Sequence, residues 1–372
     1  MLGLYIHIPF CKKICPYCDF CKTVSNEERQ YNYIEALLKE LKLKNLKNYK
    51  FDTVYIGGGT PSSLDTKLLD NFLKELNKFL DFKKVKEFTI ETNPNDLDED
   101  FIKIIANNNI NRVSIGVQTF NPKLQKIIDR YINIEDLYTK IELLNKYNIN
   151  NVNVDMIYAI PTQTIEDLKF DLEILSKLKI EHISYYSLIL EEKTIFNYLY
   201  KNNKLQLVDE NDEVKMFHYI CNYLNKYGFK RYETSNFSKK NFQSIHNLIY
   251  WNCDEYLSLG ASGSSYFENK RFTTTSNISK YIFNINRNII ELDEEIILTK
   301  EEQMNEEIIL GLRKTKGINI IKFYNKYNVS IYDKFSSIRQ LLDEGLLKLK
   351  NNRIYIPQKY IYITNHIILR II

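Results

Sequence analysis

Four of the six cysteines lie close together near the N-terminus, in the run Cys11-Lys-Lys-Ile-Cys15-Pro-Tyr-Cys18-Asp-Phe-Cys21. Soft thiolate ligands select zinc, copper(I) or iron–sulfur clusters. Structural zinc sites usually take two ligand pairs separated by a longer loop, whereas cysteines on one short loop suit a single compact cluster. Three cysteines on a four-iron cluster leave one iron open to a small ligand. The alternative is a zinc site with Cys21 or His7 as the fourth ligand.

A second set of polar residues follows the predicted strands. The run Gly57–Pro61 lets backbone approach a ligand closely, and it lacks the Lys-Ser/Thr ending of a phosphate loop. Glu91 can accept from an amine or a ribose, while Gln118 and Asp155 offer amide and carboxylate contacts. Arg130 suits a carboxylate. The alternative for each residue is a hydrogen bond that caps a strand end.

These residues need a scaffold, and the hydrophobic pattern supplies one. Short β-rich runs are predicted as strands at Leu4–Ile8, Thr53–Ile56, Glu87–Glu91, Arg112–Gly116, Asn151–Asp155 and His182–Ser187. Amphipathic stretches between them predict helices, among them Glu27–Leu46, Lys67–Phe79, Ile134–Tyr147 and Ile165–Leu178. Alternating strands and helices predict an α/β fold, a partial parallel (β/α)6 barrel whose chemistry lies at the C-terminal strand ends.

The pattern changes after about residue 205. Residues 210–226 predict a helix, Tyr227–Ser265 is loop-rich, and the stretches 301–312, 318–327 and 335–344 are helical. A hairpin around Asn351-Asn352 then completes a smaller winged-helix-like C-terminal domain. The predicted divisions are 1–225 for the barrel, 226–290 for an extension that closes it, and 291–372 for the C-terminal domain. DNA binding is the alternative role for that last domain.

Composition bounds the function class. The 372 residues are 44% hydrophobic and 26% charged, and the net charge of +4 is spread along the chain. A diffuse excess does not make a nucleic-acid patch, so no nucleic-acid partner is expected. Clustered cysteines in a chain of this length indicate metal binding in a reducing compartment rather than a disulfide scaffold. With too little sequence before Cys11 for a signal peptide and no long apolar run, a cytoplasmic protein is expected.

The spacing Cys-x3-Cys-x2-Cys after the first strand, with an aromatic at Tyr17, resembles the radical SAM signature. The resemblance implies that Cys11, Cys15 and Cys18 hold a [4Fe-4S] cluster. In that superfamily the open iron takes the amino and carboxylate groups of S-adenosylmethionine, and reduction cleaves the sulfonium to a 5′-deoxyadenosyl radical. The cofactor does the chemistry, and the protein positions it.

The resemblance extends over nearly the whole chain to the coproporphyrinogen-dehydrogenase-like branch, through Tyr5–Cys11, Gly57–Ser62, Ser114–Phe120 and His182–Ser184. It departs at Ala159 and Thr162, where the family usually has Gly. The resemblance implies that the following residues contact S-adenosylmethionine: Tyr5, Tyr17, Gly58, Gly59, Thr60, Glu91, Gln118, Arg130 and Asp155.

Within this branch the sequence is similar to the HemW-type haem chaperones. The dehydrogenases carry a further cysteine where this chain has Phe20, and Cys21 fits neither pattern. The run His246-Asn-Leu-Ile-Tyr250-Trp251 resembles the HemW motif tied to haem, which implies haem contact by these three residues. Imidazole is a common haem ligand, and aromatic rings stack on porphyrins. The alternative is that His246 and Trp251 only pack the open side of the barrel.

The resemblance implies a haem chaperone that binds the cluster, S-adenosylmethionine and haem, and delivers haem to acceptor proteins, with membrane respiratory enzymes as candidates. The alternative is an oxygen-independent coproporphyrinogen III dehydrogenase of porphyrin biosynthesis. Ser264 and Ile132 replace histidines usual in the family, which puts firm haem binding in doubt. Whether S-adenosylmethionine is cleaved, and whether the protein is a homodimer or touches a membrane peripherally, stays open.

Overall fold

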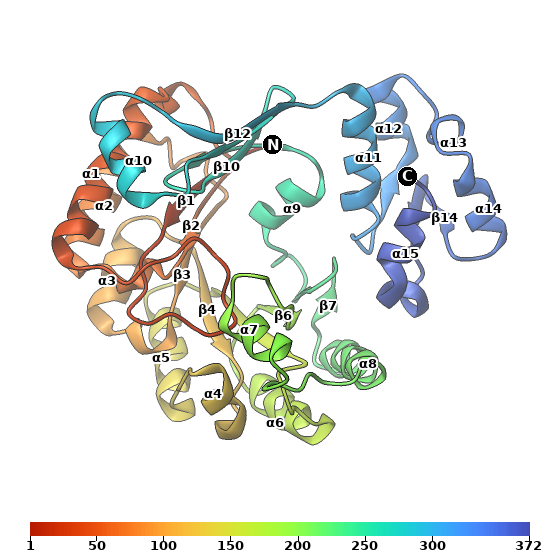
Figure 1. Cartoon of the computed structure of the whole chain (residues 1–372), viewed down its shortest axis with the longest axis horizontal. Coiled ribbons are helices and arrows are strands. Elements are labelled where there is room, and N and C mark those ends of the chain that lie inside the picture. The colour runs from red at the N-terminus through yellow and green to blue at the C-terminus, as the bar shows by residue number, and fades with distance from the viewer.

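A computed structural model describes residues 1–372 (Figure 1). Its centre is a twelve-stranded sheet in the order β12-β11-β10-β9-β1-β2-β3-β4-β5-β6-β8-β7. The six central strands are parallel and keep their sequence order, as the partial-barrel prediction requires. They are β1 Leu2–Ile8, β2 Thr53–Gly58, β3 Glu87–Thr92, β4 Arg112–Gln118, β5 Asn151–Tyr158 and β6 His182–Ser187.

Side chains of the central strands alternate between two environments. On β4, Val113 and Ile115 face outward into the main hydrophobic core, whereas Arg112 and Ser114 face the barrel interior. A parallel sheet covered by apolar layers on both faces would show continuous apolar runs instead. The inner face therefore surrounds polar groups. Helices cover the outer face (Figure 1): α1 Glu27–Leu43, α2 Thr66–Phe79, α3 Glu99–Asn107, α4 Pro122–Ile128, α5 Ile134–Lys146 and α6 Ile165–Leu175.

The predicted α/β class and all six predicted strands are confirmed, with small differences at element ends. β5 runs to Tyr158, three residues beyond its predicted end, and the helix predicted over Glu27–Leu46 stops at Leu43. Helices α3 and α4 were not predicted. Both are short, with nine and seven residues, so their apolar period covers too few turns to stand out. None of the helices is both long and apolar enough to cross a membrane.

The segment Tyr227–Ser265, predicted to be loop-rich, also holds short regular elements that were not predicted. They are a seven-residue helix, three short strands and the start of a fourth, which are too brief to show a hydrophobic period. β9 pairs in parallel with β1, while β8 pairs antiparallel with β6 at the opposite edge of the central strands. The elements after β6 are α7 Ile195–Lys201, α8 Glu210–Lys226, β7 Lys230–Arg231, β8 Asn236–Ser238, α9 Ile245–Trp251, β9 Glu255–Leu259, β10 Ser264–Phe267, β11 Lys270–Thr274, α10 Ile278–Asn286 and β12 Leu292–Ile297.

Helix α9 lies against the starts of β1 and β2, where its N-terminus is held by Glu87 of β3. The buried Glu87 carboxylate accepts from Ser244 Oγ at 3.1 Å and from the backbone N–H groups of Ile245 and His246 at 2.9 Å each. An anion at this position satisfies N–H groups that have no partner within the helix. Gly3 leaves room for the helix, since a Cβ there would meet Ile249 at 3.1 Å.

The C-terminal region has a hydrophobic core of its own, as expected for a winged-helix-like domain. Strand β12 still belongs to the large sheet, and the division of the chain at residues 225 and 290 stays a prediction. The predicted hairpin is present, and Asn351 and Asn352 both have positive φ, as a two-residue type I′ turn requires. The elements are α11 Lys300–Gly311, β13 Ile318–Asn319, α12 Ile320–Tyr327, α13 Ile331–Lys334, α14 Ser337–Asp343, β14 Lys348–Lys350, β15 Arg353–Tyr355 and α15 Thr364–Leu369.

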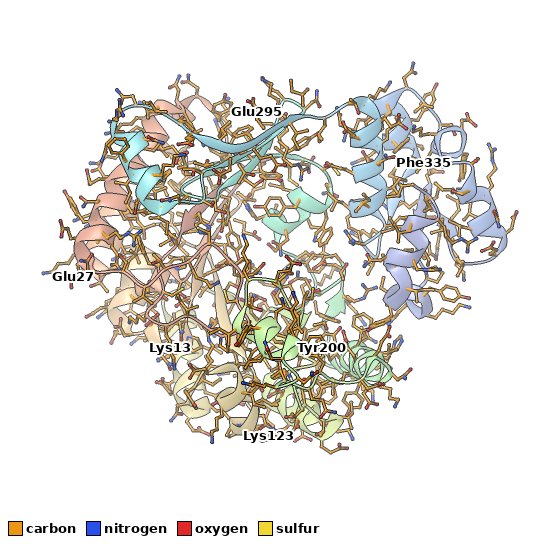
Figure 2. The ribbon with its side chains drawn as sticks, in the orientation of Figure 1. Lys13, Glu27, Lys123, Tyr200, Glu295 and Phe335 are labelled. Atoms are coloured by element: carbon orange, nitrogen blue, oxygen red, sulfur yellow. The ribbon has the colours of Figure 1, made fainter.

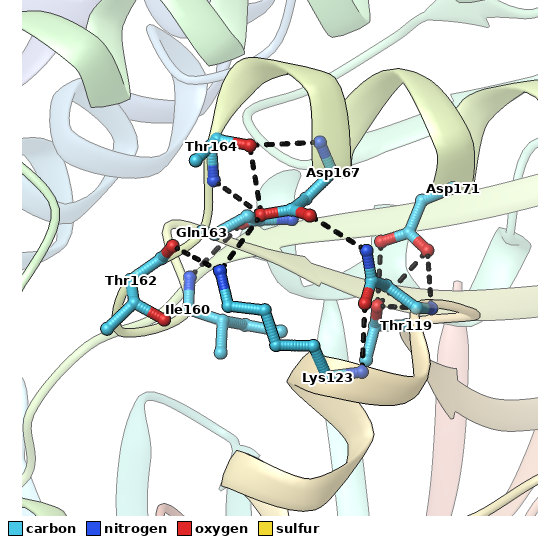
Figure 3. Close-up of polar contacts among 9 residues, drawn as sticks. Thr119, Lys123, Ile160, Thr162, Gln163, Thr164, Asp167 and Asp171 are labelled. Atoms are coloured by element: carbon cyan, nitrogen blue, oxygen red, sulfur yellow. Dashed lines mark hydrogen bonds and ion pairs between the residues drawn. The ribbon is translucent and has the colours of Figure 1, made fainter.

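A buried polar cluster ties the segment after β4 to α6 (Figure 3). The Asp171 carboxylate accepts from Thr119 Oγ1 at 2.8 Å, from the Phe120 N–H at 2.7 Å and from the Asn121 N–H at 3.1 Å. This clamp holds the chain next to Gln118, which itself has a φ of 74°. A non-glycine residue keeps such a conformation only where its surroundings enforce it.

The turn that leads into α6 explains one departure from the family pattern. The Gln163 N–H donates to Ile160 O at 2.8 Å, Pro161 follows Ile160, and Thr162 has a φ of 66° (Figure 3). These are the features of a type II turn, which favours glycine at the third position. Ala159, the other departure, also has positive φ, at 58°.

We therefore expect Thr162→Gly to stabilise the protein. Relief of the left-handed strain outweighs the entropic cost of glycine, for a net gain of about 0.5–1 kcal/mol in the free energy of unfolding. Urea unfolding followed by circular dichroism measures it. The control is Thr139→Gly on the exposed side of α5, which should destabilise the protein. Equal losses from both variants would contradict the strain argument.

Candidate functional site

A cavity of about 600 Å³ opens at the C-terminal ends of the central strands. It brings together residues that are more than 140 positions apart in the sequence, including the cysteine loop, and Figure 2 shows the side chains that surround the barrel, with Lys13 of that loop labelled. The predicted site residues that line the cavity are Cys11, Cys15, Tyr17, Cys18, Gly58, Gly59, Thr60, Glu91, Gln118, Arg130 and Asp155.

The cysteine loop is fixed to the barrel rim at its base and along its first residues. The Cys11 N–H donates to Thr23 O at 3.0 Å, which closes the base of the loop. Lys12 and Lys13 form ion pairs of 2.6 Å with Asp96 and Asp129, which follow β3 and α4. Exposed ion pairs contribute little energy each. Their role here is to direct the loop across the cavity.

Two polar groups lie beside the cysteine thiols. Thr60 Oγ1 lies 3.6 Å from Cys11 Sγ, and Arg130 Nη1 lies 3.7 Å from Cys15 Sγ. Burial raises the pKa of the Cys11 and Cys18 thiols. Because thiolates are the metal-binding form, iron must displace a proton from each of these thiols, and the neighbouring donors stabilise the negative sulfur that results.

The zinc alternative finds no fourth ligand in the structure. The two ring nitrogens of His7 bond to Tyr5 Oη at 3.0 Å and to Cys21 O at 2.8 Å. The Cys21 thiol lies 3.5 Å from Ser276 O, and Cys21 does not line the cavity. No three His, Cys, Asp or Glu side chains converge on one point where a single ion would sit. A four-iron cluster spreads its thiolates over separate irons and needs no such convergence.

The glycine run brings backbone against the start of the cysteine loop. The N–H groups of Gly59 and Thr60 donate to Ile8 O at 2.8 Å and to Phe10 O at 2.7 Å. A Cβ on Gly59 would come within 2.7 Å of Phe10 O, so no side chain fits there. Gly58 has a φ of 121°, a conformation that L side chains rarely adopt.

Two carboxylates face the same cavity. Glu91 accepts from Tyr55 Oη at 2.7 Å and from the Gly58 N–H at 3.1 Å, while Asp155 accepts from Ser114 Oγ and from Asn153 Nδ2, each at 2.8 Å. Burial raises the pKa of Glu91 to about 7, although its two hydrogen bonds oppose the shift. A cationic amine beside Glu91 would restore its charged form.

Arg130 fits the carboxylate of an amino-acid ligand. Its Nε has no hydrogen-bond partner although it is shielded from solvent, and its side chain lies beside Cys15. A guanidinium cannot lose its charge in a protein, so an unpaired edge invites an anion. Close to the cysteines, Arg130 and Gln118 can hold the amino-acid end of S-adenosylmethionine. The three-cysteine loop, glycine run, carboxylates and arginine thus fit a cluster with this ligand.

Four predicted residues lie outside the cavity lining: Tyr5, His246, Tyr250 and Trp251. His246 is buried, and its two ring nitrogens bond to Thr53 Oγ1 and to Tyr250 Oη at 2.7 Å each. Burial lowers the pKa of His246 to about 3, so the imidazole is neutral. Ligation of haem iron by His246 therefore requires that at least one of these hydrogen bonds break.

The structure adds cavity residues that the sequence-based prediction missed, among them Tyr55, Arg112, Asn153, Ser184 and Asn247. The first four are polar side chains on the inward positions of β2, β4, β5 and β6. A period of two within those strands was the signal that could have identified them. Asn247 lies on α9 and gave no such signal, because that helix was not predicted.

Comparisons with known proteins agree with this geometry. Residues 5–175 match the radical SAM superfamily, and residues 298–359 match the HemN C-terminal domain. The chain is 38% identical over 364 residues to the heme chaperone HemW of Lactococcus lactis, covering 98% of this chain and 95% of that protein. It is 34% identical to heme chaperone HemW of Bacillus subtilis, covering 96% of each chain.

Among solved structures, coproporphyrinogen III oxidase (HemN) from Escherichia coli, a radical SAM enzyme, superposes with a TM-score of 0.86. The match covers 100% of this chain and 89% of that one at 20% identity, which shows a shared fold. The barrel and its cysteine loop define a radical SAM architecture. At the level of sequence identity given above, the chain belongs to the HemW family within that superfamily.

The first prediction from the site concerns the cysteines. We expect Cys11→Ala, Cys15→Ala and Cys18→Ala each to abolish the brown colour and most of the bound iron after anaerobic reconstitution, because each removes one cluster ligand. Cys21→Ala is the matched control and should keep both. Iron and sulfide analysis with visible spectroscopy measures the outcome. Loss of the cluster in the Cys21 variant alone would contradict the ligand set.

The second prediction concerns pH. Glu91 keeps its proton in the native state up to a pH of about 7, whereas the unfolded chain loses it near 4.5. Between these values the native state holds more protons, so the free energy of unfolding of the cluster-free protein falls as pH rises. We expect Glu91→Gln to reduce this decrease in the free energy of unfolding by about 2 kcal/mol. Urea unfolding at about pH 5 and about pH 7.5 measures it. Equal pH dependence in both proteins would contradict the prediction.

Proposed function

We propose that the protein is a radical SAM haem chaperone, which holds a [4Fe-4S] cluster and S-adenosylmethionine in the barrel and hands haem to acceptor proteins. The single observation that carries the proposal is the identity of 38% with a heme chaperone HemW over 98% of this chain. The cavity supports it, because it places the three cysteines, Arg130 and the two carboxylates on one shared space. Bound S-adenosylmethionine would supply a carbon radical on reduction.

The chain's own groups have separate tasks in this proposal. Cys11, Cys15 and Cys18 hold the cluster, and Arg130 holds the amino-acid carboxylate of the ligand. Glu91 takes the amine or the ribose, while Gly58 and Gly59 let the backbone approach. As part of the same proposal, the acceptors are haem-accepting proteins, with membrane respiratory enzymes as candidates. The cytoplasm as the site of action, peripheral contact with a membrane and a homodimer remain predictions.

The test is haem uptake and transfer by the reconstituted protein. We expect the wild type to be brown and to develop a Soret band on haem titration, and a haem-free acceptor to gain that band on mixing. Absence of haem uptake by a protein with an intact cluster would contradict the chaperone function. An anaerobic assay with coproporphyrinogen III, S-adenosylmethionine and a reductant tests the dehydrogenase alternative. Because Phe20 stands where dehydrogenases have cysteine, we expect no protoporphyrinogen.

Two variants separate haem contact by His246 from its structural role. His246→Ala removes the imidazole. Thr53→Ala removes one hydrogen bond to the imidazole but leaves the imidazole in place. If His246 contacts haem, His246→Ala should weaken the Soret band and Thr53→Ala should leave it. Equal effects in the two variants would show that the residue only holds α9 in place.

A further inference from the structure

Arg112 is a buried cation at the floor of the cavity with no anionic partner. Its side chain is 2% exposed, it lines the cavity, and its Nε has no hydrogen-bond partner. The ion pairs made by arginine involve Arg271, Arg339 and Arg370, and none involves Arg112. Arg112 lies close enough to Glu91 to oppose the rise in the pKa of that carboxyl, but no ion pair joins the two side chains. A buried charge without an ion-pair partner is costly, so an anionic ligand would stabilise it.

The carboxylates near Arg112 are already engaged by other donors. Glu91 is held by Tyr55 and Gly58, and Asp155 by Ser114 and Asn153, all within 3.1 Å. Two histidines near it, His182 and His246, are buried and hydrogen-bonded, and burial lowers the pKa of both, so both are neutral. A group that pairs directly with Arg112 would therefore come from a ligand.

Asn247 lies on the same floor and belongs to the motif helix α9. Its backbone N–H bonds to Ser244 Oγ, while its carboxamide forms no hydrogen bond within the protein and lines the cavity. A guanidinium and an amide donor that line the same cavity are suited to a carboxylate. Arg130 lies near the cysteines instead, so the cavity holds two unpaired guanidinium groups for two different acids.

The side chains at the mouth of the cavity indicate that the ligand is also apolar. Five large apolar or aromatic side chains line it although each is strongly exposed: Ile14, Phe20, Tyr131, Tyr186 and Ile189. Phe20 and Ile189 are 66% and 67% exposed. Exposed apolar groups and a buried cation in one cavity fit a flat, apolar molecule that carries an acid on one edge.

Resting on the proposed haem function, we propose that Arg112 and Asn247 bind a propionate of the haem, with the apolar mouth residues against the rest of the ring. The haem thus enters with its acidic edge towards the barrel floor. Of the motif in residues 246–251, Asn247 contacts the haem directly, and the buried His246 keeps α9 in position.

The test compares haem with haem dimethyl ester, whose propionates are masked, on the reconstituted wild type, on Arg112→Gln and on Asn247→Ala. We expect both variants to lower haem affinity, at least tenfold for Arg112→Gln. The affinity of the wild type for the ester should equal the affinity of Arg112→Gln for haem. The ester should bind wild type and Arg112→Gln equally. Arg339→Gln, at an exposed position on α14, is the matched control and should bind haem like the wild type.

Each other outcome overturns the inference in a recognisable way. Equal binding of haem and its ester by the wild type excludes a propionate contact, and it needs no variant, so it decides the question even if Arg112→Gln fails to fold. Loss of S-adenosylmethionine binding by Arg112→Gln, with haem binding unchanged, would assign Arg112 to that ligand instead. No haem uptake by the wild type would contradict the proposed function itself.

Discussion

Apolar and polar side chains alternate along the six central strands, and the rest of the structure depends on this alternation. Apolar residues such as Val113 and Ile115 bury one face of the sheet under the helices, and this burial is the main stabilising contribution. The opposite face is polar, and a polar group removed from water must find a partner. The barrel interior is therefore a network of hydrogen bonds, in which His182 links Asn153 to Tyr232 and Glu87 holds α9.

Against that background the unsatisfied groups carry information. Most inward-facing polar side chains have partners at ordinary hydrogen-bond distances. The buried atoms without a partner include the Nε atoms of Arg112 and Arg130, which are charged, and neutral oxygens such as Thr89 Oγ1 and Asn151 Oδ1. The two lie at different depths, one at the barrel floor and one beside Cys15. Two carboxylates, Glu91 and Asp155, line the same cavity, so its charged groups can meet both amine and acid groups of ligands.

The parts of the fold and site that could be predicted from sequence are those with a local signal. The six strands and long helices show hydrophobic periods, the cysteine loop has a distinctive spacing, and the residues at strand ends follow from the parallel arrangement. Helix α9 could not be predicted, because its seven residues cover about two turns and its stability depends on Glu87, more than 150 positions away. For the same reason the sequence could not show that His246 is buried and bonded to Thr53.

The residues with positive φ show where this chain can use another residue in place of glycine. The chain has 11 glycines, and ten of its seventeen non-glycine residues at positive φ are asparagine. Asparagine tolerates the left-handed region better than most residues, so it can replace glycine at exposed turns. It cannot do so where a Cβ would collide, as at Gly59 against Phe10 or at Gly317, where a Cβ would lie 1.9 Å from Ile354 O. Asparagine can thus serve in the surface turns of this chain, while steric contact with backbone requires glycine at position 59 beside the cysteine loop.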